Sequence, residues 1–154
     1  MINTPGQKAG RNGRSFERIL KAMLDDHPRY ASAYQVRFKT GKADGRPCTY
    51  DALIADRISG DRIIISCKAQ YSSGSTEEKV PFELLHLSHS LQAEVADRAY
   101  LVLHGNGFSR VRNFYLSNIF KKYMPVLAYG APWPDNLIML DSETLDMRIK
   151  KEIL

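Results

Sequence analysis

Apolar residues recur along this chain at two spacings, one typical of helices and one typical of strands. From residue 15 onward they fall at intervals of three and four, which predicts an amphipathic helix whose apolar face holds Phe16, Ile19, Leu20, Met23 and Leu24. Pro28 ends this helix, because a proline disfavours helical geometry in the residue before it. A second stripe predicts a helix that begins near Pro81, and its apolar face holds Val80, Leu84, Leu87, Leu91 and Val95.

The strand-like segments lie mainly between these helices. Residues 34–38 alternate between polar and apolar, and residues 50–58 and 62–70 form two runs joined by a short Ser-Gly-Asp turn, which predicts a hairpin. Residues 99–103 are continuously apolar and short enough for a buried strand, and residues 137–140 form a further short strand. With helices expected over 111–123 and 143–153, the order predicts an α/β fold, a central mixed sheet flanked by helices on both faces.

Composition and length narrow the class of protein. The 154 residues are enough for one domain, here expected over 15–154, and residues 1–14, rich in glycine and basic residues, are expected to form a flexible basic arm. Apolar residues make up 44% and charged residues 25%, which excludes disordered and collagen-like chains. No apolar run approaches a membrane span, the polar and basic residues 1–14 are not expected to act as a secretory signal, and the two cysteines lie far apart. We therefore expect a cytoplasmic protein with reduced thiols and no membrane partner.

Positive charge is concentrated in the first third of the chain. The net charge is +5, but residues 1–46 carry ten basic and four acidic residues and so hold +6, while the remainder holds −1. Such an asymmetry favours a polyanionic partner, most commonly nucleic acid. The candidates for phosphate contacts are Lys8, Arg11, Arg14, Arg37, Lys39, Lys42 and Arg46.

The second strand of the predicted hairpin carries the candidate chemistry. Ser66, Lys68 and Gln70 alternate with Cys67 and Ala69, so the three polar side chains point to one face. A lysine at the end of a buried strand needs an anionic partner, which is either a carboxylate or a substrate phosphate. Asp51, on the neighbouring strand, can lie close to Lys68 across the hairpin. An aspartate, a lysine and a second carboxylate on adjacent strands can hold Mg²⁺ and an attacking water beside a phosphodiester.

In these residues the chain resembles the PD-(D/E)XK nucleases, the restriction-endonuclease-like superfamily. The resemblance rests on Asp51, on the strand from Ser66 to Gln70, on the loop 74–79 with its Glu-Glu-Lys sequence, and on the helix start at residues 12–17. The strand and turn over 100–108 fit a later strand of the same core. The resemblance covers roughly residues 12–140 and implies the restriction-endonuclease-like fold.

Two positions depart from the family pattern. Tyr50 replaces the proline before the aspartate, and Ser66 stands where the second acid is expected. One branch of type II restriction endonucleases has a Ser-x-Lys strand and a glutamate relocated to the following helix, which favours Glu83. The Glu-Glu-Lys loop instead favours Glu78, with Glu77 ranked lower, so the identity of the acid stays open.

The resemblance implies a role for each residue. Asp51 and the backbone carbonyl of Cys67 would bind Mg²⁺ (or Mn²⁺ in its place), and Lys68 would activate the attacking water and stabilise charge on phosphorus. Gln70 would fix a water or phosphate oxygen, or it would satisfy backbone groups at the strand end. Glu17 would hold a metal-bound water, or it would pair on the helix surface with Arg14 or Lys21. Lys68 as a simple ion-pair partner of Asp51 is the alternative for that pair.

These roles lead to an expected function. The chain is expected to be a Mg²⁺-dependent endonuclease of the type II restriction class, acting on double-stranded DNA as a homodimer. The alternatives are a catalytically inactive DNA-binding relative, motivated by Ser66, a homing or junction-resolving nuclease, and an RNA-cleaving toxin of the same fold.

Overall fold

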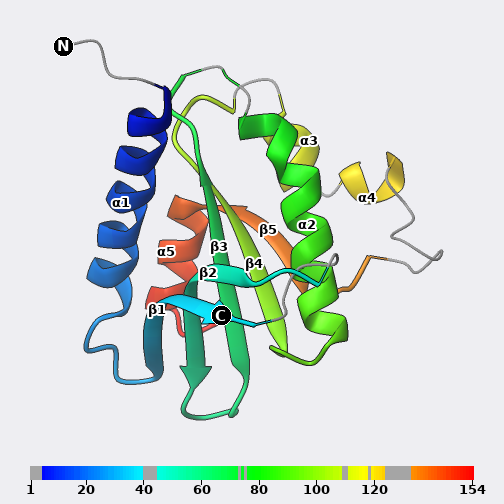
Figure 1. Ribbon diagram of the computed structural model, residues 1–154. Coiled ribbons are helices and arrows are strands. Elements are labelled where there is room, and N and C mark those ends of the chain that lie inside the picture. Colours follow the sequence, from blue (N-terminus) through cyan, green and yellow to red (C-terminus); the bar gives the residue numbers. More distant parts are fainter. Residues whose placement is uncertain are drawn as a thin grey trace.

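The computed structural model describes residues 5–39, 45–72, 74, 76–108, 111–117, 119–123 and 133–154. Within these residues a five-stranded sheet runs in sequence order, formed by β1 (Tyr30–Phe38), β2 (Cys48–Asp56), β3 (Arg62–Ala69), β4 (Arg98–His104) and β5 (Leu137–Asp141). The first three strands pair antiparallel and the last three parallel. The sheet is therefore mixed, as the sequence predicts (Figure 1).

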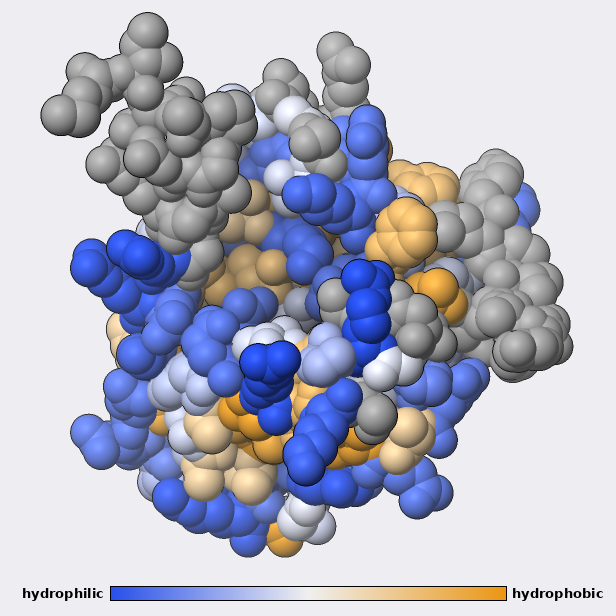
Figure 2. Space-filling model, in the orientation of Figure 1, coloured by the Kyte–Doolittle hydropathy of each residue, from blue (hydrophilic) through white to orange (hydrophobic). Residues whose placement is uncertain are grey.

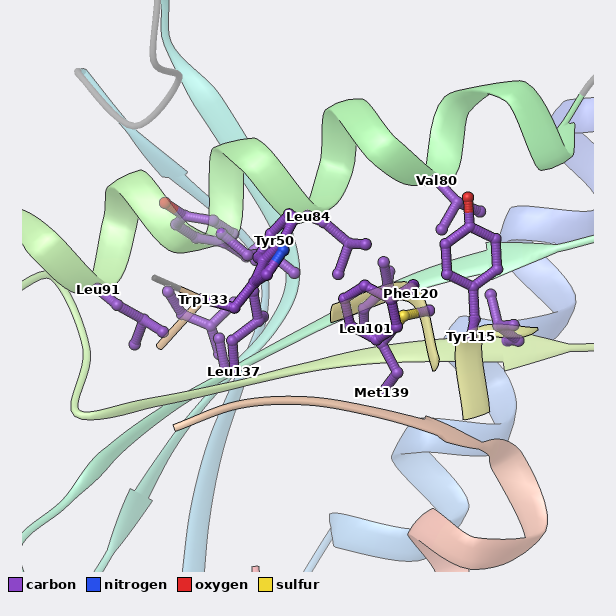
Figure 3. Packing of buried hydrophobic residues seen from close by; sticks show 14 of the residues in the cluster. Tyr50, Val80, Leu84, Leu91, Leu101, Tyr115, Phe120, Trp133, Leu137 and Met139 are labelled. Carbon is purple, nitrogen blue, oxygen red and sulfur yellow. The ribbon is translucent and has the colours of Figure 1, made fainter. Parts of the chain in front are cut away.

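Helices cover both faces of this sheet, which confirms the predicted architecture. On one face α1 (Pro5–Leu24) and α5 (Ser142–Lys150) pack their apolar residues against alternate residues of β2, β3 and β4. On the other face lie α2 (Thr76–Gln92), α3 (Arg112–Leu116) and α4 (Ile119–Tyr123). Figure 3 shows this second core, in which residues of α2 meet Leu101, Tyr115 and Phe120. Hydrophilic residues dominate the outer surface seen in Figure 2.

Three elements differ from the sequence-based expectation. The helix α1 begins at Pro5, so residues 5–14 are helical where we expected a flexible basic arm. Proline is favoured in the first turn of a helix, which fits a start at Pro5. The glycines at 6, 10 and 13 have low helix propensity, so the sequence of this segment did not predict a helix. The helix α2 begins at Thr76, which puts Pro81 inside it rather than in its first turn. The single helix expected over 111–123 is two short ones, α3 and α4.

The strands β2 and β3 separate partway along their length. Their pairing runs from Ala55 opposite Arg62 to Ala52 opposite Ile65, whereas β1 and β2 stay paired as far as Cys48. We call the point after Ala52 and Ile65, where β2 and β3 stop pairing, the fork. Beyond the fork, the buried side chain of Tyr50 packs in the core under α2, and its hydroxyl contacts that of Ser90. Tyr50 thus anchors this part of β2 to α2, and Asp51 lies where β2 leaves β3.

Two further expectations bear on the class of protein. Cys48 and Cys67 form no disulfide with each other. In the described part of the chain, none of the helices combines the length and the apolar character that crossing a bilayer requires.

Candidate active site

Glu83 reaches the sheet because of its place in the helical repeat of α2. Val80, Leu84 and Leu87 are fully buried against the sheet. Glu83 lies three residues after Val80 and four before Leu87, so it shares the side of the helix that faces β3. Its carboxylate therefore lies between α2 and β3.

The carboxylate of Glu83 contacts two polar side chains of β3, those of Ser66 and Lys68. The hydroxyl of Ser66 donates to Oε1 at 2.5 Å, and the ammonium of Lys68 lies 2.9 Å from Oε2. Ser66 is 3% exposed, and the side chains of Lys68 and Glu83 are 23% and 17% exposed. The direct anionic partner of Lys68 is thus Glu83, whose carboxylate also lies against the hydroxyl of Ser66.

At the fork, the side chain of Asp51 accepts a backbone N–H of β3 beyond the last paired residues of β2 and β3. Its Oδ2 accepts the backbone N–H of Cys67 at 2.7 Å, next to the point where the β2–β3 ladder ends. The charges of Lys68 and Glu83 both act on it. Two carboxylates and one ammonium therefore gather where β2 leaves β3.

The two carboxyl groups have opposite electrostatic environments. Burial raises the pKa of Asp51 above its ordinary value, and the Cys67 N–H and the charge of Lys68 only partly oppose it. Burial also acts to raise the pKa of Glu83, but the charge of Lys68 and the hydrogen bond from Ser66 outweigh it and leave that pKa lowered. Burial, followed by the charge of Asp51, raises the pKa of the Cys67 thiol well above its usual range. The thiol therefore stays protonated, and position 67 contributes its backbone.

Gln70 lies at the end of β3 and is 4% exposed. Its amide nitrogen donates to the carbonyl of Gly107 at 2.8 Å and to Glu77 Oε1 at 3.3 Å. The backbone of Gln70 also donates to the His104 carbonyl and accepts from the Gly107 N–H. Of the two alternatives for Gln70, these contacts match the one in which it satisfies backbone groups at the strand end.

Other candidates lie away from this cluster. Glu78 is exposed at the start of α2, and Glu17 pairs with Lys21 at 2.8 Å on α1, which matches its alternative as a surface acid. Four of the basic candidates are exposed on α1 or near the β1–β2 connection: Arg14, Arg37, Lys39 and Arg46. The side chains of Lys8 and Arg11, and the whole of Lys42, lie outside the described residues.

One residue beside Asp51 is absent from the sequence-based candidates. Gln35 lies on β1 between Tyr34, which pairs with Ala52, and Val36, which pairs with Tyr50, so it stands across from Asp51. Gln35 has a φ of 50°, which is unusual for a glutamine within a strand. No sequence signal marks this residue, because neither its type nor its neighbours indicate a left-handed conformation.

The donor set at the fork suits a hard divalent cation. Asp51, Glu83 and the Cys67 carbonyl offer oxygen atoms only, and Mg²⁺ is commonly bound through one or two carboxylates plus water and substrate phosphate. Across the described ranges, no three His, Cys, Asp or Glu side chains cluster as a ready-made metal cage. The residues present thus fit an open site that a substrate would complete.

Comparison with known families gives one match. The model of the PD-(D/E)XK nuclease superfamily domain matches residues 8–123, a range that includes Gln35, Asp51, Ser66, Lys68 and Glu83. The searches of curated proteins and of solved structures gave no significant match.

Proposed function

The chain belongs to the PD-(D/E)XK nuclease superfamily, and from this premise we propose that it is a Mg²⁺-dependent endonuclease that hydrolyses phosphodiester bonds of double-stranded DNA. Within the superfamily we place it with the type II restriction endonucleases of the Ser-x-Lys variant. The observation that carries the proposal is the contact of Ser66 and Lys68 with Glu83 beside Asp51. Glu83, on α2, thereby supplies the second acid that the sequence of β3 lacks.

The residues of the site divide the work of hydrolysis. Asp51, Glu83 and the Cys67 carbonyl would hold the divalent ion, which supplies positive charge opposite the phosphate oxygens when bound. Lys68 would donate to the attacking water and stabilise negative charge as it develops on the phosphate. Ser66 would orient Glu83, and Gln70 would fix the end of β3 against Gly107, so that Lys68 keeps its place.

Two further parts of the proposal concern the substrate. The exposed basic residues Arg14, Arg37, Lys39 and Arg46 would contact the phosphate backbone and position the duplex without reading its sequence. A homodimer is the simplest arrangement in which a chain with one such site cuts both strands. Its test is whether the protein sediments as a dimer with DNA and linearises a plasmid in one binding event.

The deciding experiment is cleavage of plasmid DNA by the purified protein in Mg²⁺, Mn²⁺ or EDTA, beside Asp51→Asn and Lys68→Met. We expect cleavage by the wild type with either metal, none in EDTA, and none by the variants. DNA binding without cleavage in any divalent metal would instead support the alternative of a catalytically inactive DNA-binding relative, which the serine at position 66 suggests. Cleavage of tRNA in preference to DNA would support the RNA-cleaving alternative.

A further inference from the structure

Lys79 lies one helical turn before Glu83 on α2, yet the two side chains do not pair. On α1, Lys21 and Glu17 are also four residues apart, and there the ammonium lies 2.8 Å from the carboxylate. The carboxylate of Glu83 turns instead to β3, where it contacts two polar side chains. Lys79 is exposed, and no acid in the described ranges forms an ion pair with it. Its ammonium is therefore available to a ligand.

The position of Lys79 in the helical repeat places it on the side of α2 that borders the site. Residues four apart lie one above the other on the same side of a helix, so Lys79 stands about 6 Å from Glu83 along the axis. Val80 is fully buried in the core, and Glu78 is exposed roughly 100° around the helix from Lys79. A cation thus lies one turn before the carboxylate that we assign to the divalent ion.

The paired ends of β1 and β2 border the site from the other direction. We call residues 36–38 and 48–50, which stay paired beyond the fork, the β1–β2 ribbon. This ribbon extends toward α2 (Figure 1), where Tyr50 contacts Ser90 near the C-terminal end of the helix. Lys79 is in the first turn of α2. Along the helix, Glu83 therefore lies between Lys79 and the ribbon.

Arg37 shares a side of the β1–β2 ribbon with Asp51. Arg37 pairs with Thr49, which is two residues from Asp51, and side chains two residues apart in a strand point to the same side. Tyr50, between them, points to the other side and is buried. Arg37 and Thr49 are exposed, and two residues of strand span about 7 Å. A second cation thus lies one short step beyond Asp51.

We propose that Lys79 is a substrate-binding residue that holds a phosphate next to the scissile one, with Arg37 holding the neighbouring phosphate on the other side. The strand to be cut then runs across the fork, from the first turn of α2 to the β1–β2 ribbon. This inference rests on the proposed function. Its physical basis is that a chain of phosphates needs positive charge on both sides of the two carboxylates, Asp51 and Glu83, which would otherwise repel it.

Three variants test the contact of Lys79. Lys79→Gln removes the ammonium, and Lys151→Gln removes an exposed one after α5, on the opposite face of the sheet, as the matched control. The double variant Glu78→Gln/Lys79→Gln has the net charge of the wild type, so it separates a direct contact from general attraction to DNA. The measurements are the melting temperature, duplex affinity in EDTA at several salt concentrations, and single-turnover cleavage in Mg²⁺.

Lys79→Gln should reduce the slope of log affinity against log salt by about 1 and weaken binding about tenfold at 0.1 M salt. The double variant should keep both losses, and Lys151→Gln should show neither. All three should melt close to the wild type, because substitutions of exposed side chains usually change stability little. Wild-type affinity and slope in Lys79→Gln, or their recovery in the double variant, would overturn the contact.

Duplexes with one uncharged methylphosphonate test the path of the strand, once the cut has been mapped. On one side of the scissile phosphate, the methylphosphonate should weaken wild-type and Arg37→Gln binding but affect Lys79→Gln little further. On the other side, the roles of the two variants should be exchanged. Such non-additivity identifies a side chain and a phosphate that act through one contact.

Two outcomes of this second test would count against the inference. Additive losses for Lys79→Gln at both phosphates would overturn its contact beside the scissile phosphate. Coupling of both variants to the same phosphate would overturn the path from Lys79 to Arg37. A wild type that binds duplex but cleaves it in no divalent metal would overturn the proposed function instead, and the affinity and salt measurements would still decide whether Lys79 contacts a phosphate.

Discussion

Lys68 and Glu83 form an ion pair of 2.9 Å between two side chains that are each more than three-quarters buried. Removing one partner of such a pair leaves an uncompensated buried charge and typically costs about 3–5 kcal/mol. Truncation to alanine would therefore mix loss of stability with loss of catalysis. Variants that keep the shape of the side chain, with each paired to a control, give the sharper tests.

Glu83→Gln should lower single-turnover cleavage by about 100-fold or more, whereas Glu78→Gln should leave it near the wild-type rate. The reason is that Glu83 contacts Ser66 and Lys68, while Glu78 is exposed. Because glutamine leaves Lys68 without its charged partner, a lower melting temperature is expected as well. Loss of cleavage in Glu78→Gln, with Glu83→Gln active, would assign the acid to the start of α2 instead.

Asp51→Asn should abolish cleavage and at the same time stabilise the metal-free protein at neutral pH. The pKa of Asp51 is raised by burial, so the folded state binds its proton more tightly than the unfolded chain. The wild type therefore loses stability as the pH rises from about 4 through the raised pKa, and the variant does not. Denaturant unfolding in EDTA from pH 3 to 8 measures the difference in the free energy of unfolding between the wild type and Asp51→Asn. This difference should be small near pH 3.

An equal or lower stability of Asp51→Asn at pH 8 would contradict this reasoning. Adding Mn²⁺ provides an internal control. It should stabilise the wild type, since a ligand that binds only the folded state shifts unfolding, and it should have little effect on the variant.

Asp56→Asn should destabilise the fold while leaving cleavage unchanged at temperatures where the variant is folded. Asp56 lies at the end of β2, where the Arg29 guanidinium binds its carboxylate with distances of 2.7–3.1 Å. That hydrogen bond holds the pKa of Asp56 well below its usual range, so the carboxylate stabilises the protein above about pH 4 and less as the pH falls further. Unfolding curves of both proteins should converge in acid, and a constant difference would refute the assignment.

Gly105→Ala and Gly107→Ala should each destabilise the protein by about 1–3 kcal/mol. A Cβ at Gly105 would lie 2.4 Å from the carbonyl oxygen of Gln70, and φ there is 89°. At Gly107 it would lie 2.6 Å from Gln70 Cγ and 2.7 Å from the Ser72 carbonyl oxygen. Gly60→Ala is the control for backbone strain, because φ is 81° there with open space around it. Melting temperatures that rank Gly60→Ala with Gly105→Ala would show that strain, and not the close approach to Gln70, sets the cost.

Arg37→Gln and Lys39→Gln should weaken DNA binding about equally for all sequences. Each should also reduce the slope of log affinity against log salt by about 1, because each removes one phosphate contact. Both residues are exposed near the end of β1. Lys150→Gln, at the far end of the chain on α5, is the matched control and should leave the slope unchanged. Unchanged slopes in the first two variants would remove the end of β1 from the binding surface.

The sheet was predictable because its strands carry strong local patterns. The strand-like runs 50–58 and 62–70, the turn at Gly60 between them and the apolar run 99–103 give β2, β3 and β4 nearly at their observed bounds. The start of α2 was less predictable, because Pro81 is typical of a first turn while Thr76 in fact begins the helix. The acid stayed open for another reason, since the Ser-x-Lys strand favoured Glu83 and the Glu-Glu-Lys loop favoured Glu78. In the structure Glu83 shares the buried side of α2 with Val80 and Leu87, whereas Glu78 is exposed.

The left-handed conformation of Gln35 lay beyond sequence reasoning for a different reason. It depends on where β2 leaves β3, which is a property of the packed sheet and not of residues near position 35. The face shared by Ser66 and Lys68, by contrast, follows from strand alternation alone. Local rules thus predicted the faces of single strands and the hairpin of β2 and β3, and they did not predict the contact of Glu83 with β3 or the conformation of Gln35.

The meeting of Ser66 and Glu83 also has an evolutionary consequence. Because β3 and α2 both reach the same point, a carboxylate can be supplied there from either element. On the proposed assignment of Glu83, a chain with an acid in both places would keep its activity while one of them was lost, so the acid could move from one element to the other without an inactive intermediate. Relatives are then better recognised by where their carboxylates meet in space than by the spacing of acids along the chain.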